Sequence, residues 1–174
     1  MASPEYGIQA HLWWREEIAR RDMDLIRDAG FDWVKQNVGW RDVEGAAKGA
    51  FDWYFTDRIV ADAEARGLKV LFRLDSEPAW AALKKGVRSS NGPPEDPQDL
   101  GDFCHVLAQR YRGRVMAYQV WNEPNLAREW GGYEPDPSGY VDLLRACYLG
   151  VKMADADALV ISAGLAPTGT GLPR

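Results

Sequence analysis

The chain lacks several features that mark whole classes of protein. No apolar run in its 174 residues approaches the roughly 18 residues that a membrane-spanning helix needs. The sequence has no dense stretch of lysine or arginine and a formal net charge of −5, so we expect neither nucleic acid nor a membrane as a partner. With 46% hydrophobic residues, it has enough apolar side chains for one packed domain over residues 1–174.

Histidine and cysteine are also scarce. The chain has two of each, and neither histidine has cysteine or carboxylate side chains at the spacing of a metal site. Because no nucleotide-binding motif is present either, we expect no metal and no cofactor. Cys104 and Cys147 each lie on an apolar face of an expected helix, which favours two buried thiols. A disulfide would require neighbouring helices with Cβ atoms about 4 Å apart.

The N-terminus, residues 1–5, has no basic region followed by an apolar stretch, as a signal peptide would have. We therefore expect a soluble chain. Secretion is compatible with this expectation if a signal peptide precedes the residues given, so the compartment stays open.

Apolar runs alternate with helical patterns along the chain. The runs that we expect to be strands are residues 6–12, 33–38, 69–74, 115–120 and 159–162. The segments that we expect to be helices are residues 15–29 and 56–66 and two that begin at Asp96-Pro97 and Asp136-Pro137, each a cap followed by proline. This alternation indicates an α/β fold with a parallel sheet. A doubly wound sheet is the rival, but it normally has a glycine-rich loop where this chain has His-Leu-Trp-Trp, residues 11–14.

The segment Trp121–Asn125, with sequence WNEPN, directly follows an expected strand. A carboxylate at the C-terminal end of a parallel strand opens onto the face where barrel enzymes build active sites. Glu123 is therefore the candidate proton donor, with Asn122 as a polar neighbour that can bind substrate. The alternative is that Asn-Glu-Pro is a polar turn that caps the next element.

WNEPN resembles the acid/base signature of the retaining glycoside hydrolases of clan A, which are built on the (β/α)8 barrel. The chain is similar to the family 39 type of that clan from Tyr6–His11 to Ser162–Pro167, although only WNEPN is a specific motif. The resemblance implies hydrolysis of an O-glycosidic bond in a carbohydrate, with Glu123 as acid/base and Asn122 bonded to the sugar 2-hydroxyl. It also implies a nucleophilic Glu at the end of a seventh strand.

A complete barrel usually needs about 250 residues, so we expect a partial TIM barrel that corresponds to strands 1 to 5, without the strand of the nucleophile. Three interpretations stay open. The chain is the acid/base half of a glycosidase, completed by a second copy in a homodimer or by a C-terminal half barrel. Alternatively, it is a carbohydrate-binding half barrel without catalysis. The third is a fragment of a longer glycosidase, cut in the segment Gly169–Arg174.

Charged residues near the strand ends add to the candidate site. Lys35 and Arg73 interrupt apolar strands, so each must be paired, face a wet cavity or point outward between helices. Asp75 and Glu77 follow the third strand, and we favour a loop-ordering role over substitution for the nucleophile. Gln119 shares one strand face with Glu123 by alternation.

The residues that we expect to bind the substrate lie at or just after strand ends, where flat aromatic faces can stack on sugar rings. They are His11, Trp40, Arg73, Asp75, Trp80, Trp121, Asn122 and Trp130. For each tryptophan alone, a place in the core or a loop anchor is an equal alternative.

Overall fold

The computed structural model describes residues 4–82 and 91–168, so the predicted cut within Gly169–Arg174 lies outside the described residues. Within the described part, five strands form one parallel sheet in the order β1-β2-β3-β4-β5. The strands are β1 (Gly7–Ala10), β2 (Trp33–Gly39), β3 (Lys69–Asp75), β4 (Val115–Val120) and β5 (Leu159–Ser162). Each strand pairs with its neighbour in sequence, as in a barrel. This confirms the predicted α/β architecture of a partial TIM barrel and rejects the doubly wound sheet, whose strand order reverses.

Helices connect the strands. They are α1 (Glu16–Asp28), α2 (Trp40–Val43), α3 (Tyr54–Glu64), α4 (Pro97–Arg110), a 3-10 helix (Ala127–Glu129) and α5 (Pro137–Ala154). The predicted starts of α4 and α5 are confirmed, because Asp96 and Asp136 accept hydrogen bonds from backbone N–H groups in the first turn. The sequence did not indicate α2 or the 3-10 helix, since a single turn is too short to show periodicity. Within the described residues, no helix is long and apolar enough to cross a membrane.

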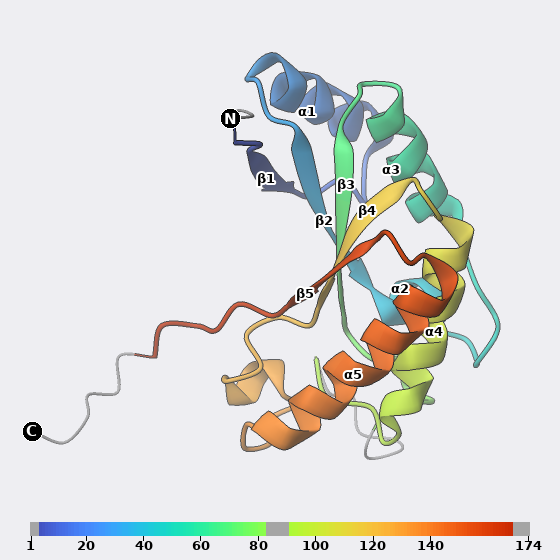
Figure 1. Cartoon of the computed structure of the whole chain (residues 1–174), viewed down its shortest axis with the longest axis vertical. Coiled ribbons are helices and arrows are strands. Elements are labelled where there is room, and N and C mark those ends of the chain that lie inside the picture. Colours follow the sequence, from blue (N-terminus) through green and yellow to red (C-terminus); the bar gives the residue numbers. More distant parts are fainter. Residues whose placement is uncertain (1–3, 83–90, 169–174) are drawn as a thin grey trace, which may run out of the picture.

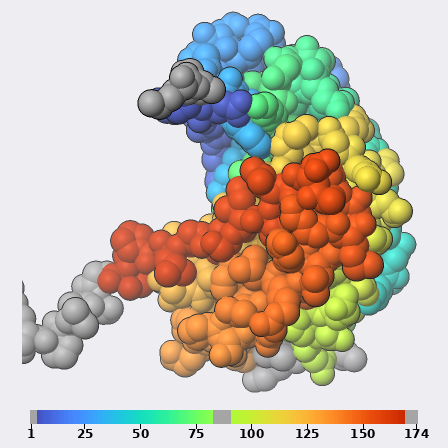
Figure 2. Space-filling model, in the orientation of Figure 1, coloured from blue at the N-terminus to red at the C-terminus, as the bar shows by residue number. Residues whose placement is uncertain are grey.

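The two faces of the sheet differ. Alternate residues of β2 and β3, among them Val38, Phe72 and Leu74, are fully buried and form the core beneath the helices, which lie on one side of the sheet (Figure 1). The other face is open, and the molecular outline is indented between β1 and the segment after β5 (Figure 2). A hollow of about 350 Å³ lies on this concave face, lined by Glu5, Gly7, Ile8, Gln9, Trp33, Lys35, Leu71, Ala117, Leu159 and Ile161.

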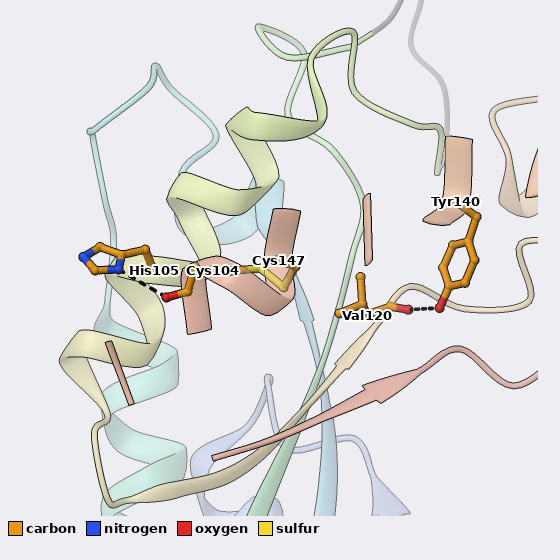
Figure 3. Close-up of a disulfide and its surroundings, with 6 residues drawn as sticks. Cys104, His105, Val120, Tyr140 and Cys147 are labelled. Atoms are coloured by element: carbon orange, nitrogen blue, oxygen red, sulfur yellow. Dashed lines mark hydrogen bonds between the residues drawn. A yellow bond between two sulfur atoms is a disulfide. The ribbon is translucent and has the colours of Figure 1, made fainter. Parts of the chain in front are cut away.

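Cys104 and Cys147 form a disulfide between α4 and α5, with their Cα atoms 5.3 Å apart (Figure 3). The prediction of two buried thiols is therefore wrong. The helices approach closely where Gly101 faces Gly150, and a Cβ atom added at Gly150 would collide with the carbonyl oxygen of Gly101. Periodicity shows on which face of its own helix each cysteine lies, but not that two glycines bring those faces together.

Candidate active site

The C-terminal ends of β2, β3 and β4 meet at one edge of the sheet. The register pairs Asn37 with Arg73, and Arg73 with Gln119. Side chains at these positions all point to the concave side, because residues in register across parallel strands share a face. The sequence-predicted residues Arg73, Asp75 and Asn122 are therefore brought together, and Glu123 follows directly after Asn122.

Arg73 lies at the centre of this cluster. Its guanidinium donates to Asn37 Oδ1 at 3.1 Å and to Asn122 Oδ1 at 3.2 Å, and it pairs with Asp75 at 3.0 Å. Of the orientations that the sequence left open, Arg73 takes the one toward the concave side. Because the amide oxygen of Asn122 is occupied by Arg73, its NH₂ group is left to donate to a ligand.

Asp75 is buried, with 2% of its surface exposed. Burial raises the pKa of Asp75, and the neighbouring Arg73 and the hydrogen bonds from Ser76 and Asn37 oppose this effect. Glu77 is also buried and accepts a hydrogen bond from the backbone N–H of Gly92 at 2.7 Å. Asp75 is thus bound by Arg73 within the sheet and by Ser76 after it, and Glu77 by the loop at Gly92, while the loop-ordering role that the sequence favoured for both stays a prediction.

Lys35 extends the cluster into the concave face. Its ammonium group donates to Gln119 Oε1 at 2.7 Å, and the amide of Gln119 donates to the carbonyl of Trp121 at 2.9 Å. Burial lowers the pKa of Lys35, as does the nearby positive charge of Arg73, while Asp75 acts in the opposite direction. Lys35 therefore also faces the concave side and is linked through Gln119 to the WNEPN turn.

The turn that carries Glu123 has an unusual backbone. Trp121 has φ 70° and Glu123 has φ 40°, both in the left-handed region. Such residues cost about 1–3 kcal/mol each, and they persist only when the surrounding contacts hold them. Here the N–H of Trp121 donates to the carbonyl of Leu74 at 2.8 Å, and the N–H of Leu126 donates to the carbonyl of Glu123 at 2.9 Å. The backbone of the turn at Glu123 is thus held by neighbouring segments.

The carboxylate of Glu123 is accessible. About a third of the side chain, 32%, is exposed, and Arg128 donates to its Oε2 at 3.3 Å. Arg128 itself is 72% exposed, so this contact lies at the surface. The carboxylate is therefore partly open to solvent, and its contact with Arg128 is not a buried one.

Three of the predicted tryptophans are buried. Trp40 and Trp121 are fully buried and Trp130 is 3% exposed. The indole N–H of Trp40 donates to Glu44 Oε2 at 2.7 Å, and that of Trp121 donates to the carbonyl of Glu129 at 2.8 Å. These rings support the loops, the alternative that the sequence offered for each of them, and sugar contact by them stays a prediction.

Trp80 and His11 are more accessible. Trp80 is partly buried, and its indole N–H donates to the carbonyl of Glu44 at 2.7 Å. Its ring contacts that of Trp40 edge-on, with 5.3 Å between centroids. His11 is exposed directly after β1. Both lie at strand ends or in loops after them, and their contact with substrate also stays a prediction.

Sequence reasoning missed Asn37 and Asn125. Asn37 lies two residues after Lys35 in β2, so alternation places it on the same face, and this signal could have found it. Asn125 was seen only as the last residue of WNEPN, yet its amide forms two hydrogen bonds with the backbone of Ala166. Nothing in the sequence indicates that pairing, because it joins segments 41 residues apart.

Within residues 4–82 and 91–168, no group of three or more His, Cys, Asp or Glu side chains is arranged to hold a metal ion. The arrangement at the strand ends instead combines one accessible carboxylate with amide and guanidinium donors. These groups suit proton transfer to, and hydrogen bonding of, a neutral hydroxylated ligand.

Comparison with protein families gives this site a context. Residues 3–164 match the family described as Cellulase (glycosyl hydrolase family 5). The chain belongs to glycosyl hydrolase family 5. The predicted relationship to clan A glycoside hydrolases is thereby confirmed, and the family 39 type that the sequence suggested is found among similar solved structures. A search of curated proteins found no significant match.

Several solved structures share the fold. A family 39 glycoside hydrolase from Bacteroides cellulosilyticus WH2 is 26% identical, with a TM-score of 0.73 over 91% of this chain and 31% of its own. GH5_18 from Streptomyces cattleya, in complex with GlcNAc, is 19% identical, with a TM-score of 0.71 over 92% of this chain and 44% of its own. Xylanase 10B from Thermotoga petrophila RKU-1, in complex with xylobiose, is 18% identical, with a TM-score of 0.61 over 91% and 49%, respectively. The chain thus spans between 31% and 49% of the length of these three structures.

Proposed function

We propose that this chain carries the acid/base half of a retaining glycoside hydrolase site, with Glu123 as the proton donor. The observation that carries the proposal is the turn after β4, which holds an accessible carboxylate beside Asn122, whose amide oxygen is bound by Arg73. Glycoside hydrolysis requires a carboxylic acid next to the glycosidic oxygen and a hydrogen bond to the 2-hydroxyl that strengthens in the transition state. Glu123 and Asn122 supply these two groups.

In this proposal Glu123 protonates the leaving oxygen as the glycosidic bond breaks, and its carboxylate then takes a proton from the attacking water. Arg128, which already donates to this carboxylate at 3.3 Å, stabilises the negative charge after the proton has left. The NH₂ group of Asn122 donates to the sugar 2-hydroxyl while positive charge develops on the ring. Arg73 keeps Asn122 in that orientation through its bond to the amide oxygen.

The second carboxylate of a retaining pair lies about 5–5.5 Å from the acid. Asp75 is buried and bound by Arg73 and Ser76, and Glu77 is buried and bound by the backbone of Gly92, so we do not assign this role to them. We propose that the nucleophile comes from a strand beyond β5, in a C-terminal half barrel that covers the concave face. A second copy of the chain would cover the same face, but it would bring a second Glu123 instead of a seventh-strand Glu.

The substrate that we propose is a carbohydrate with a β-linked leaving group, as the clan resemblance suggests. The partly exposed ring of Trp80 and the exposed His11 are proposed contacts at the edge of the site. The alternative is a half barrel that binds sugar without cleaving it. It is supported by the cluster of Asn37, Arg73 and Asn122, which forms hydrogen bonds and whose neighbouring carboxylate, Asp75, is buried and paired with Arg73.

The experiment replaces the proposed missing nucleophile with an external one. The chain is incubated with 4-nitrophenyl or 2,4-dinitrophenyl β-glycosides, with and without concentrated azide, and the products are separated by chromatography. We expect turnover close to the uncatalysed rate without azide. With azide, which attacks the anomeric carbon from the side opposite the leaving group, we expect an α-glycosyl azide.

The two leaving groups test the role of Glu123. Glu123→Gln should reduce azide-dependent cleavage of the 4-nitrophenyl glycoside by about 100-fold or more. Cleavage of the 2,4-dinitrophenyl glycoside should change far less, because dinitrophenolate leaves without a proton. Glu134→Gln, which removes the charge of an exposed carboxylate in a loop, is the matched control and should leave both rates unchanged.

Two results would decide against the proposal. Saturable sugar binding in calorimetry without azide-dependent cleavage would support the non-catalytic half barrel. Strong hydrolysis without azide that Glu123→Gln abolishes would mean that another carboxylate of this chain acts as nucleophile.

A further inference from the structure

The WNEPN turn is tied on its β5 side by a tyrosine from α5. The hydroxyl of Tyr140 donates to the carbonyl of Val120 at 3.1 Å and accepts from the N–H of Ala163 at 2.6 Å. Figure 3 shows the ring reaching from α5 to the end of β4. One side chain thus joins the last residue of β4 to the first residue after β5.

Asn125 ties the other end of the same turn. Its Nδ2 donates to the carbonyl of Ala166 at 3.0 Å, and its Oδ1 accepts from the N–H of Ala166 at 2.9 Å. Two bonds to one residue fix the plane of the amide as well as its distance. Glu123 therefore lies between two attachments, Val120 and Asn125, to the segment that follows β5.

These attachments matter because the turn has left-handed residues at Trp121 and Glu123. Contacts from β3, namely the bonds of Leu74 to Trp121 and of Arg73 to Asn122, hold only the other flank of the turn. A strained turn that is held on one side can relax toward the open side. Tyr140 and Asn125 hold the flank of the turn that faces β5, where such movement would occur.

Tyr140 is itself well anchored. It lies in the first part of α5 and packs against the hydrophobic core, and α5 is joined to α4 by the disulfide between Cys104 and Cys147. Burial raises the pKa of the Tyr140 phenol, with the bond from Ala163 opposing this effect, so the group stays a neutral donor near neutral pH. The bond to the Val120 carbonyl requires that donor.

We propose that Tyr140 and Asn125 are positioning residues that set the direction of Glu123 from the β5 side. This inference rests on the proposed acid/base role of Glu123. It assigns to α5 and to the segment after β5 a part in orienting the acid, in addition to packing.

The experiment uses Tyr140→Phe, which removes only the hydroxyl, and Asn125→Ala. Tyr148→Phe is the matched control, because Tyr148 lies on the same helix and is 47% exposed. Nuclear magnetic resonance measures the pH titration of the Glu123 side-chain carboxyl carbon, assigned with Glu123→Gln, and the amide exchange of Ala163. Azide-dependent cleavage of the two aryl glycosides is measured in parallel.

We expect the Ala163 amide to exchange about tenfold faster in Tyr140→Phe, since one hydrogen bond is lost. The titration midpoint of Glu123 should move in Tyr140→Phe and in Asn125→Ala, and should stay unchanged in Tyr148→Phe. Cleavage of the 4-nitrophenyl glycoside should fall more than that of the dinitrophenyl glycoside. A general loss of folded protein would lower both rates equally.

An unchanged Glu123 titration in both variants, with only a lower free energy of unfolding, would overturn the inference and leave a purely structural role. Failure of the proposed function gives a different result, namely no azide-dependent cleavage in the unmodified chain. The titration and the amide exchange still test the positioning of Glu123 in that case. A moved midpoint would then support the positioning contacts, while the absence of cleavage would contradict the proposed chemistry.

Discussion

The two faces of the sheet carry side chains of different character. The face beneath the helices has fully buried residues such as Val70, Phe72 and Leu74, whereas the concave face has exposed apolar residues, with Leu159 at 56% and Ile161 at 36% exposure. Charged groups are also distributed unequally, because Lys35 and Arg73 both point to the concave side. The helix-covered face is thus a buried core, while the concave face exposes apolar side chains beside charged ones, as the proposed packing of a further part against it requires.

The same contrast explains where the candidate site lies. Strands whose opposite face is buried carry Arg73 and Lys35, and the turn after β4 contains the buried Trp121, which donates to the carbonyl of Glu129. The side chain of Glu123 is 32% exposed, and Asn122 beside it is partly buried. A rigid layer behind a ligand-accessible layer is the arrangement that a catalytic site needs, because positioned groups gain most when their own supports do not move.

The largest expected loss of stability comes from a substitution on the helix-covered face, and one on the concave face serves as the comparison. Phe72→Ala should lower the free energy of unfolding by about 3–5 kcal/mol, because the ring is fully buried and contacts Tyr111 edge-on. Leu159→Ala should cost less than about 1 kcal/mol, because its side chain is already largely in water. Urea unfolding followed by circular dichroism measures both. A cost for Leu159→Ala that grows with protein concentration would instead indicate that a second copy covers the concave face.

The disulfide should give the next largest effect. Replacing both Cys104 and Cys147 with serine should lower the free energy of unfolding by about 2–4 kcal/mol, because the bond closes a loop across a separation of 43 residues. Reducing the disulfide of the unmodified protein should lower its free energy of unfolding in urea by a similar amount. Reductant should not change the unfolding of the variant in which serine replaces both cysteines. An unfolding midpoint that reductant leaves unchanged would contradict this role. Dependence on the bond would suit an oxidising compartment, as for a secreted protein.

Local patterns in the sequence predicted the sheet well. Most of the strands are runs rich in apolar residues, and the two Asp-Pro pairs begin α4 and α5, because a cap acts within a few residues of itself. WNEPN was found for the same reason, since its meaning depends on the strand directly before it. These features require only neighbours in sequence.

The contacts between distant segments were not predictable. The orientation of Arg73 stayed open because a charge in a strand can be satisfied on either side, and only the register with Asn37 decides it. The disulfide depended on two glycines that let α4 and α5 approach. Tyr140 gave no signal at all, because its partners Val120 and Ala163 are backbone groups of other elements.

The smallest effect that we expect concerns Asp75 and pH. Burial raises the folded-state pKa of Asp75 above the ordinary value of 3.8, so the folded protein holds this proton more tightly than the unfolded chain. Its contribution to stability is therefore fully present below pH 3.8 and is lost as the pH rises through the folded-state pKa. Asp75→Asn should remove this dependence of the free energy of unfolding on pH. Urea unfolding of both proteins at a series of pH values will show the difference. An opposite slope, with stability rising in that window, would mean that Arg73 outweighs burial and that the concave face is wetter around Asp75 than its exposure of 2% suggests.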